Sequence, residues 1–180
     1  DRQERLLNVV VAACLGRGDL SPDKLNEALE KLQGDPFAAS VFSRAVQDDE
    51  DEKAWFYGAL LREALWNGIE PAARVRYLRF ARDVTSHDLD VLVGLARSTL
   101  LELMQARRRA GASIEGTIKE VRGDLRNLGD EHQTLVQALV RWGFFSERSG
   151  TRWPQPDDCN EVSRLLDIAE RARREREAFG

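Results

Sequence analysis

Cysteine and histidine are scarce in this 180-residue chain, which contains only two of each. Cys14 and Cys159 are far apart and have no other common metal ligands beside them, so we expect neither a disulfide framework nor a cysteine-rich metal site. His87 and His132 are isolated from one another and fall in the first turns of expected helices, where surface histidines are common. The side chains that carry most nucleophilic and metal chemistry are therefore thinly spread.

Motifs of common enzyme classes are also lacking. The sequence has no Walker-type phosphate loop, no paired-glycine dinucleotide turn, no HExxH or CxxC, and no G-x-S-x-G. No carboxylate stands isolated in an apolar run, as a buried general acid would. Glu63 comes nearest, and an ion pair with Arg62 or an arginine of the following helix is its plainer role. We therefore predict a protein that is not an enzyme, with no cofactor and no metal ligands.

Basic residues are not in excess. The first hundred residues carry 13 Lys and Arg against 17 Asp and Glu, and the remaining eighty carry 14 of each. A protein that grips a phosphate backbone through its whole body is expected to be basic, so this balance disfavours that class. With no disulfide framework and no apolar run long enough for a membrane segment, we expect a cytoplasmic protein. Because the chain starts at Asp1, a processed or excised fragment remains an open alternative.

Helix formers dominate the composition, and the stretch KAWFYGALLREALW at residues 53–66 is the centre of the pattern. Its apolar residues cover most of a helix circumference, which is typical of a helix enclosed by other helices. Before it, the sequence predicts helices over residues 3–15, from Ser21-Pro22 to Gly34, and from Asp35-Pro36 onward. Ser or Asp followed by Pro is a favoured helix start.

Five consecutive acids, residues 48–52, precede the central helix and predict an exposed joint between helices. Those nearest the helix also favour its N-terminal dipole. A cation site is the alternative, although calcium loops alternate ligands with spacers and need a glycine turn that this run lacks. Whether this acidic loop binds a cation therefore stays open.

After the central helix, residues 71–84 predict a helix with Val75, Leu78 and Ala81 facing inward and four arginines over its other faces. A long helix follows, from about residue 86 to 109. We expect an all-α body of about six helices over residues 1–111.

The last part of the chain, residues 112–180, has a different order. Two further helices, over about 113–128 and 130–142, precede the stretch GFFSERSGTRWPQP at 143–156, which reads as strand, turn, strand. A final helix follows, and its polar end at 172–180 is expected to fray. Helix, helix, hairpin, helix is the order of a winged-helix-like unit with one β-hairpin.

The first hundred residues resemble the TerB-like family of small helical domains, which is linked to tellurite resistance and phage defence. The resemblance rests on Ala12-Ala13, on the break at Gly16–Asp19, and on Leu20-Ser21-Pro22 opening the next helix. It implies a helical domain in a bacterial stress or defence system. The family has an acidic residue directly before the glycine of this break, whereas Arg17 holds that position here. The family's acidic metal site is therefore not carried over.

From Lys53 onward the chain is more loosely similar to bacterial abortive-infection alpha proteins. The similarity is carried by FYGALLREAL, by RFARDVTSHDLDVLVGLA and by LVRWGFF. It implies a helical body followed by a winged-helix-like end.

Aromatic residues gather in the central helix and around the expected hairpin, in excess of what one helix side buries. Because aromatic residues are enriched at interfaces, we expect a non-catalytic interaction module that binds a protein partner or a second copy. The candidate interface residues are Trp55, Tyr57, Trp66, Phe144, Phe145 and Trp153. The alternative is a nucleic-acid-binding regulator of the winged-helix type, whose candidate contacts are Arg141, Arg148 and Arg152.

Overall fold

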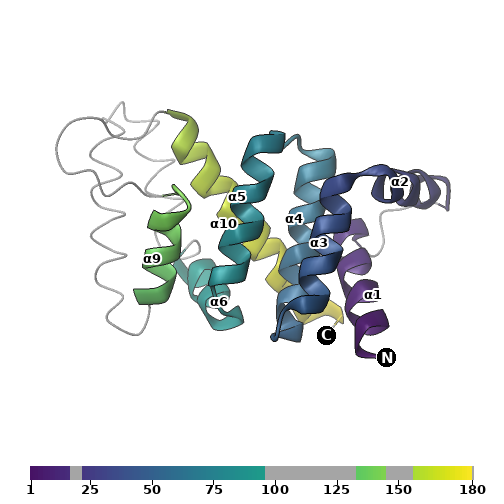
Figure 1. Ribbon diagram of the computed structural model, residues 1–180, viewed down its shortest axis with the longest axis horizontal. Helices are drawn as coiled ribbons and strands as arrows, with labels where there is room; N and C mark the ends of the chain where they lie inside the picture. Colours follow the sequence, from purple (N-terminus) through teal and green to yellow (C-terminus); the bar gives the residue numbers. More distant parts are fainter. Residues whose placement is uncertain (17–21, 96–132, 145–155, 180) are drawn as a thin grey trace. The chain divides into compact units, whose positions relative to one another are not determined.

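A computed structural model of the chain describes residues 1–16, 22–95, 133–144 and 156–179 (Figure 1). These residues are predominantly helical and include no strand, which confirms the all-α prediction for the described part of the chain. The elements are α1 (Arg2–Leu15), α2 (Pro22–Gly34), α3 (Pro36–Gln47), the 3-10 helix η1 (Asp51–Lys53), α4 (Ala54–Trp66), α5 (Pro71–Asp83), α6 (Ser86–Leu95), α9 (Gln133–Arg141) and α10 (Pro156–Phe179).

The chain divides into two compact units. The first unit contains residues 1–86 and returns for residues 168–180, and the second contains residues 87–167. The C-terminal half of α10 is therefore part of the first unit, whereas the sequence pattern assigns the whole helix to the predicted unit of residues 112–180. The boundary expected between residues 111 and 112 falls outside the described residues.

Helix α4 is the centre of the first unit and packs against α1, α3 and α5. In Figure 1, α5, α4 and α3 stand next to one another, and α1 lies beside α3. Eight of the 13 residues of α4 are buried, on all sides of the helix, which confirms the prediction of an enclosed central helix. They are Ala54, Phe56, Tyr57, Gly58, Ala59, Leu60, Leu61 and Ala64.

Small residues allow α1 and α4 to approach closely. A Cβ atom built on Gly58 of α4 would lie 2.5 Å from the carbonyl oxygen of Val10 and 2.5 Å from the Cβ of Ala13, both in α1. Only glycine fits at this point, because real Cβ atoms stay at least about 3.0 Å from such neighbours. The α1–α4 contact therefore depends on Gly58.

The helix starts follow the local signals in the sequence. The Asp35 carboxylate accepts hydrogen bonds from the backbone N–H groups of Phe37 (2.7 Å) and Ala38 (3.2 Å), so it caps α3 in front of Pro36. The second helix runs from Pro22 to Gly34, as its start and stop residues predict.

The inward face of α5 differs from the predicted one. Val75 is 46% exposed, whereas Tyr77, Phe80 and Ala81 are buried. The predicted face, with Val75, and the observed face, with Tyr77 and Phe80, lie close together on the helix. The aromatic rings occupy the core because they are larger and bury more apolar area. The prediction that Val75 faces inward is therefore wrong.

In the second unit, α6 buries Leu89, Leu92 and Val93, and α9 buries Leu135, Ala138 and Leu139. Helix α9 ends at Arg141, two residues before Gly143, which has a φ of 76°, and the N–H of Phe144 donates to the carbonyl of Leu139 at 2.9 Å. This is a glycine-terminated helix end. Gly143 and Phe144 were expected to begin a strand, and that expectation is wrong. The rest of the predicted hairpin, residues 145–155, lies outside the described residues.

The end of α10 is helical through Phe179, which corrects the expectation that it frays. Arg173 and Glu177 pair one turn apart, with the Arg Nε donating at 2.7 Å. Ala172 is buried, and Arg176 lies 3.8 Å from Glu52. Contacts within the helix and with the acidic run thus hold this last turn.

Candidate functional site

The acidic run ahead of α4 is a structural junction and not simply an exposed joint. The carboxylate of Asp48 accepts hydrogen bonds on the same oxygen from the Tyr57 hydroxyl (2.6 Å) and from Lys53 Nζ (2.8 Å). The Asp48 and Lys53 side chains are only 8% and 3% exposed. Burial, together with the bond to Asp48, raises the pKa of the Tyr57 hydroxyl. The run thus anchors the start of the central helix.

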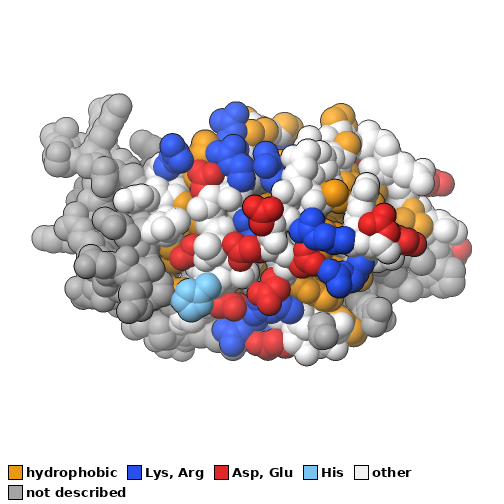
Figure 2. All heavy atoms as spheres, turned by 60° about the horizontal axis from the view of Figure 1, so that its bottom comes forward, with side chains coloured by type: hydrophobic (Ala, Val, Ile, Leu, Met, Phe, Trp, Pro, Cys, Tyr) orange, Lys and Arg blue, Asp and Glu red, His pale blue; other side chains and the backbone are white. Residues whose placement is uncertain are grey.

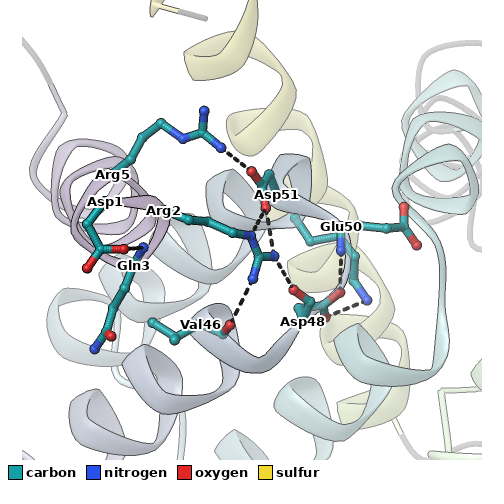
Figure 3. A network of polar contacts seen from close by, with 9 residues as sticks. Asp1, Arg2, Gln3, Arg5, Val46, Asp48, Glu50 and Asp51 are labelled. Atoms are coloured by element: carbon teal, nitrogen blue, oxygen red, sulfur yellow. Dashed lines mark hydrogen bonds and ion pairs between the residues drawn. The ribbon is translucent and has the colours of Figure 1, made fainter.

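The same run holds the first turn of α1 (Figure 3). The guanidinium of Arg2 donates to the Asp51 carboxylate at 2.8 Å and to the carbonyl of Asp48 at 2.6 Å, and Arg5 also pairs with Asp51. The hydrogen bond from Arg2 is the main cause that lowers the pKa of Asp51. Asp51 therefore stays ionised to lower pH than an isolated aspartate.

Two further acids of the run contact later residues of the first unit. Glu50 accepts a hydrogen bond from the first N–H of α6, at Ser86, at 2.8 Å, and Glu52 faces Arg176 of α10. The run is thereby committed to contacts within the chain. Among the described residues, no His, Cys, Asp and Glu side chains form a group of three or more that could hold a metal ion.

Two arginines cap the C-terminal ends of helices by donating to backbone carbonyls there. Arg62 of α4 donates to the carbonyls of Leu15 (2.8 Å) and Cys14 (3.4 Å), which are among the last carbonyls of α1 and have no partner within that helix. Its guanidinium fills the space where residue 16 would carry a Cβ, and Gly16 has a φ of 67°. Glycine at position 16 is thus favoured by its backbone conformation, whereas the tip of the Arg62 side chain can shift away from a Cβ.

Arg74 of α5 has the corresponding role at the end of α4. It donates to the carbonyls of Ala64 (3.0 Å) and Ile69 (2.9 Å), and it lies 3.4 Å from the carboxylate of Asp35. Its guanidinium also lies over the ring of Phe37. Arg62 and Arg74 therefore support the helical body.

An open groove of about 370 Å³ lies along the outer side of α1. Its apolar lining consists of Val9, Ala12, Trp55 of α4 and Phe179 of α10. Its polar lining consists of Asp1, Glu4, Arg5 and Asn8. Trp55 is half-buried and Phe179 is 40% exposed, so both rings reach the surface. The two ends of the chain thus meet at one open, aromatic-lined surface.

The surface seen in Figure 2 carries a mixture of positive and negative side chains, with apolar patches between them. Among the described side chains on this face, positive and negative groups alternate and no large area carries one charge sign. A broad positive field of the kind that nucleic-acid backbones select is therefore not seen over this described area.

The predicted interface aromatics do not gather at one place. Trp55 lines the groove, while Tyr57 is fully buried and belongs to the core, because its hydroxyl reaches Asp48 there. Trp66 is 40% exposed at the end of α4, where Lys31 of α2 lies 5.8 Å from its ring centre. Phe144 is buried in the second unit. Phe145 and Trp153 lie outside the described residues.

Of the three predicted nucleic-acid contacts, Arg141 is exposed at the end of α9 and lies over the ring of Trp142. Arg148 and Arg152 lie outside the described residues. His87 is exposed in the first turn of α6, as expected, and His132 also falls outside the described residues. Glu63 accepts a hydrogen bond from the side-chain amide of Asn67 (2.5 Å).

Sequence reasoning missed the contributions of Asn8, Val9 and Phe179 to the groove. Val9 stands in the apolar run VVVAA but outside the face that the helical period assigns to the core, which was a usable signal. Phe179 is the only aromatic residue in the polar end of α10, and a lone ring there was a second signal. Neither signal indicates that the two residues share one surface.

In the described part of the chain, no helix combines the length and the apolar character needed to cross a bilayer. Comparison of the chain with protein-family models, with curated proteins and with solved structures gives no match. The groove and the chemistry around it are therefore the features that bear on function.

Proposed function

We propose that this chain is a non-catalytic protein-interaction module and that it binds its partner at the groove along α1. The observation that carries the proposal is the composition of the groove. Its apolar lining includes Val9, Trp55 and Phe179, and the polar side chains of Glu4 and Asn8 lie beside them. Protein interfaces combine an apolar centre with a polar rim, and aromatic residues are enriched there. The TerB-like resemblance adds a bacterial stress or phage-defence setting to the proposal.

The charged residues around the core are engaged in contacts within the chain, which supports the same proposal. Arg62 and Arg74 cap helices, and Asp48 and Lys53 form a buried pair. Such contacts stabilise the helical body that presents the groove. We assign these side chains to the scaffold and the groove to recognition.

A second candidate function is a nucleic-acid-binding regulator with a winged-helix-like end. The observation that favours it is the exposed position of Arg141 at the end of α9, directly ahead of the segment that carries Arg148 and Arg152. In this alternative the hairpin predicted over residues 143–156 would start after Phe144 and would bring the three arginines to a phosphate backbone.

Light-scattering mass over a concentration series, with and without mixed-sequence duplex DNA at low salt, tests the two functions against each other. The interaction module is expected to keep the same mass with and without DNA. A mass increase with DNA that disappears at higher salt would contradict the module and support the regulator. The triple variant Arg141→Ala, Arg148→Ala, Arg152→Ala should then lose the DNA complex, whereas Arg174→Ala, at an exposed site on α10, should keep it.

A further inference from the structure

The shape of the groove matches an elongated ligand. The groove is lined by Asp1, the N-cap of α1, and by Arg5, Asn8 and Ala12 of that helix, which are spaced three or four apart and so lie along one side. The eleven steps from Asp1 to Ala12, at a rise of 1.5 Å each, correspond to a length of about 16 Å, or three helical turns. The groove therefore has the length of a short helix.

The lining of the groove offers an apolar contact with polar groups still available beside it. Val9 and Ala12 form the α1 side, and the rings of Trp55 and Phe179 come from two other helices. The side chain of Asn8 makes no hydrogen bond with any described residue and is exposed. An apolar groove with accessible hydrogen-bonding groups at its edge is the arrangement that takes the apolar face of an amphipathic helix.

Charge determines which helix fits. The charged side chains that line the groove are the two carboxylates of Asp1 and Glu4 and the single guanidinium of Arg5. Arg5 pairs with Asp51, a carboxylate that it shares with Arg2. The carboxylate of Asp1 only caps its own helix, through the N–H of Gln3, and Glu4 is exposed and pairs with no described residue. The end of the groove at the start of α1 therefore attracts a cationic side chain.

We propose that the groove binds one amphipathic helix of a partner protein, about three turns long. This helix lays apolar residues spaced at i, i+3 or i+4, and i+7 against Val9 and Trp55, and it places a Lys or Arg beside Glu4. The inference rests on the proposed function, since it specifies the partner of the same surface. Among possible occupants, a helix with a basic end is the one that the acidic carboxylates select.

The test uses a displayed library of 14-residue helical peptides, randomised on one face and at the flanking charged positions, selected on the intact chain. Selected peptides are expected to carry the apolar spacing and an excess of Lys or Arg. In fluorescence anisotropy, Val9→Lys should weaken binding by about tenfold or more, because it puts a charge into the apolar contact. Glu4→Gln should weaken binding about threefold at low salt, and much less at high salt.

The matched control is Glu30→Gln, at an exposed site on α2 that does not line the groove, and it should leave affinity unchanged. Circular dichroism melts check that each variant is folded. Should Val9→Lys fail to fold, Asn8→Lys provides the same test at an exposed position of the groove.

Three results would overturn the inference. They are a selection with no enrichment, selected peptides without apolar spacing or basic residues, and binding that Val9→Lys and Asn8→Lys leave intact. A fourth contradicting result would be that the chain forms a dimer and that Val9→Lys dissociates it, because the groove would then bind a second copy of the chain. In each case the proposal of a protein-interaction module is still supported if the chain does not bind DNA. A salt-sensitive DNA complex would contradict that proposal independently of the peptide result.

Discussion

Gly58 of α4 lies so close to the carbonyl of Val10 in α1 that a Cβ at residue 58 would be 2.5 Å from that oxygen. Gly58→Ala must therefore push the two helices apart, because a backbone atom cannot swing aside. We expect the free energy of unfolding to fall by about 2 kcal/mol, although alanine by itself favours a helix by about 1 kcal/mol over glycine. Urea unfolding followed by circular dichroism measures the change.

Gly34→Ala is the matched control in the same unit. A Cβ at Gly34 would meet no atom within 4 Å, and its φ is not positive. The substitution should leave the free energy of unfolding unchanged or raise it slightly. Equal effects of the two substitutions would show that α1 and α4 are not in the close contact described above.

Arg62→Ala should destabilise the first unit through the end of α1. The substitution removes two charge-assisted hydrogen bonds to the carbonyls of Leu15 and Cys14, and we expect a loss of about 2 kcal/mol in the free energy of unfolding. Arg62→Lys should recover part of it, since an ammonium group also donates to helix-end carbonyls. Arg174→Ala, at an exposed arginine of α10, is the control, and a loss of the same size there would contradict the capping role.

The central helix and most helix starts could be predicted because their signals are local. The apolar residues of 53–66 cover the helix circumference, and Asp35-Pro36 contains a cap and a fixed φ within two neighbouring residues. Which face of α5 is inward could not be predicted, because Val75 and Tyr77 both fit a helical stripe and only packing against other helices selects Tyr77.

The candidate site was less accessible to sequence reasoning. Trp55 was predicted as an interface residue and lines the groove, but the groove also requires Val9 and Phe179, which are distant in sequence. Tyr57 is also aromatic and lies only two residues after Trp55, yet it is buried, and its hydroxyl donates a hydrogen bond to Asp48. Such long-range relations depend on tertiary packing and leave no fixed spacing in the sequence.

The stability of the chain should fall at alkaline pH through Cys14. Burial raises the pKa of its thiol from 9.0 to about 12, and the charge of Arg62 offsets only part of that effect. The native state therefore holds the thiol proton at a pH where the unfolded state has lost it. Stability is complete below pH 9.0 and declines up to about pH 12, by at most about 1.4 kcal/mol per pH unit.

Cys14→Ala tests this decline, because alanine has no proton to lose. Urea unfolding at several pH values above 9.0 should give a shallower pH dependence for the variant than for the wild type. The comparison is cleanest below pH 10.0, since Tyr57, whose pKa is also raised, adds a similar loss above its ordinary value of 10.0. Parallel curves for the two proteins would rule out the contribution of Cys14.

The acid side should depend on Asp51. The hydrogen bond from Arg2 lowers its pKa from 3.8, so the native state favours the ionised form, and the resulting stability is present above pH 3.8 and lost as the pH falls below it. Asp51→Asn should therefore flatten the decrease of the melting temperature on acidification. Asp49→Asn, at an exposed aspartate two residues earlier, should keep the wild-type slope, and a slope equally flattened there would contradict the assignment to Asp51.

The buried pair of Asp48 and Lys53 should be strongly coupled. Lys53→Met leaves the Asp48 carboxylate buried without its cation, so we expect a loss of about 3 kcal/mol in the free energy of unfolding. The double variant Asp48→Asn, Lys53→Met removes both charges and should lose much less than the sum of the single changes, which urea unfolding in a double-mutant cycle measures. Lys31→Met, which breaks an exposed pair with Glu27, should change stability by only about 0.5 kcal/mol. Additive effects at Asp48 and Lys53 would mean that the junction is held by Tyr57 and the backbone contacts of Arg2 alone.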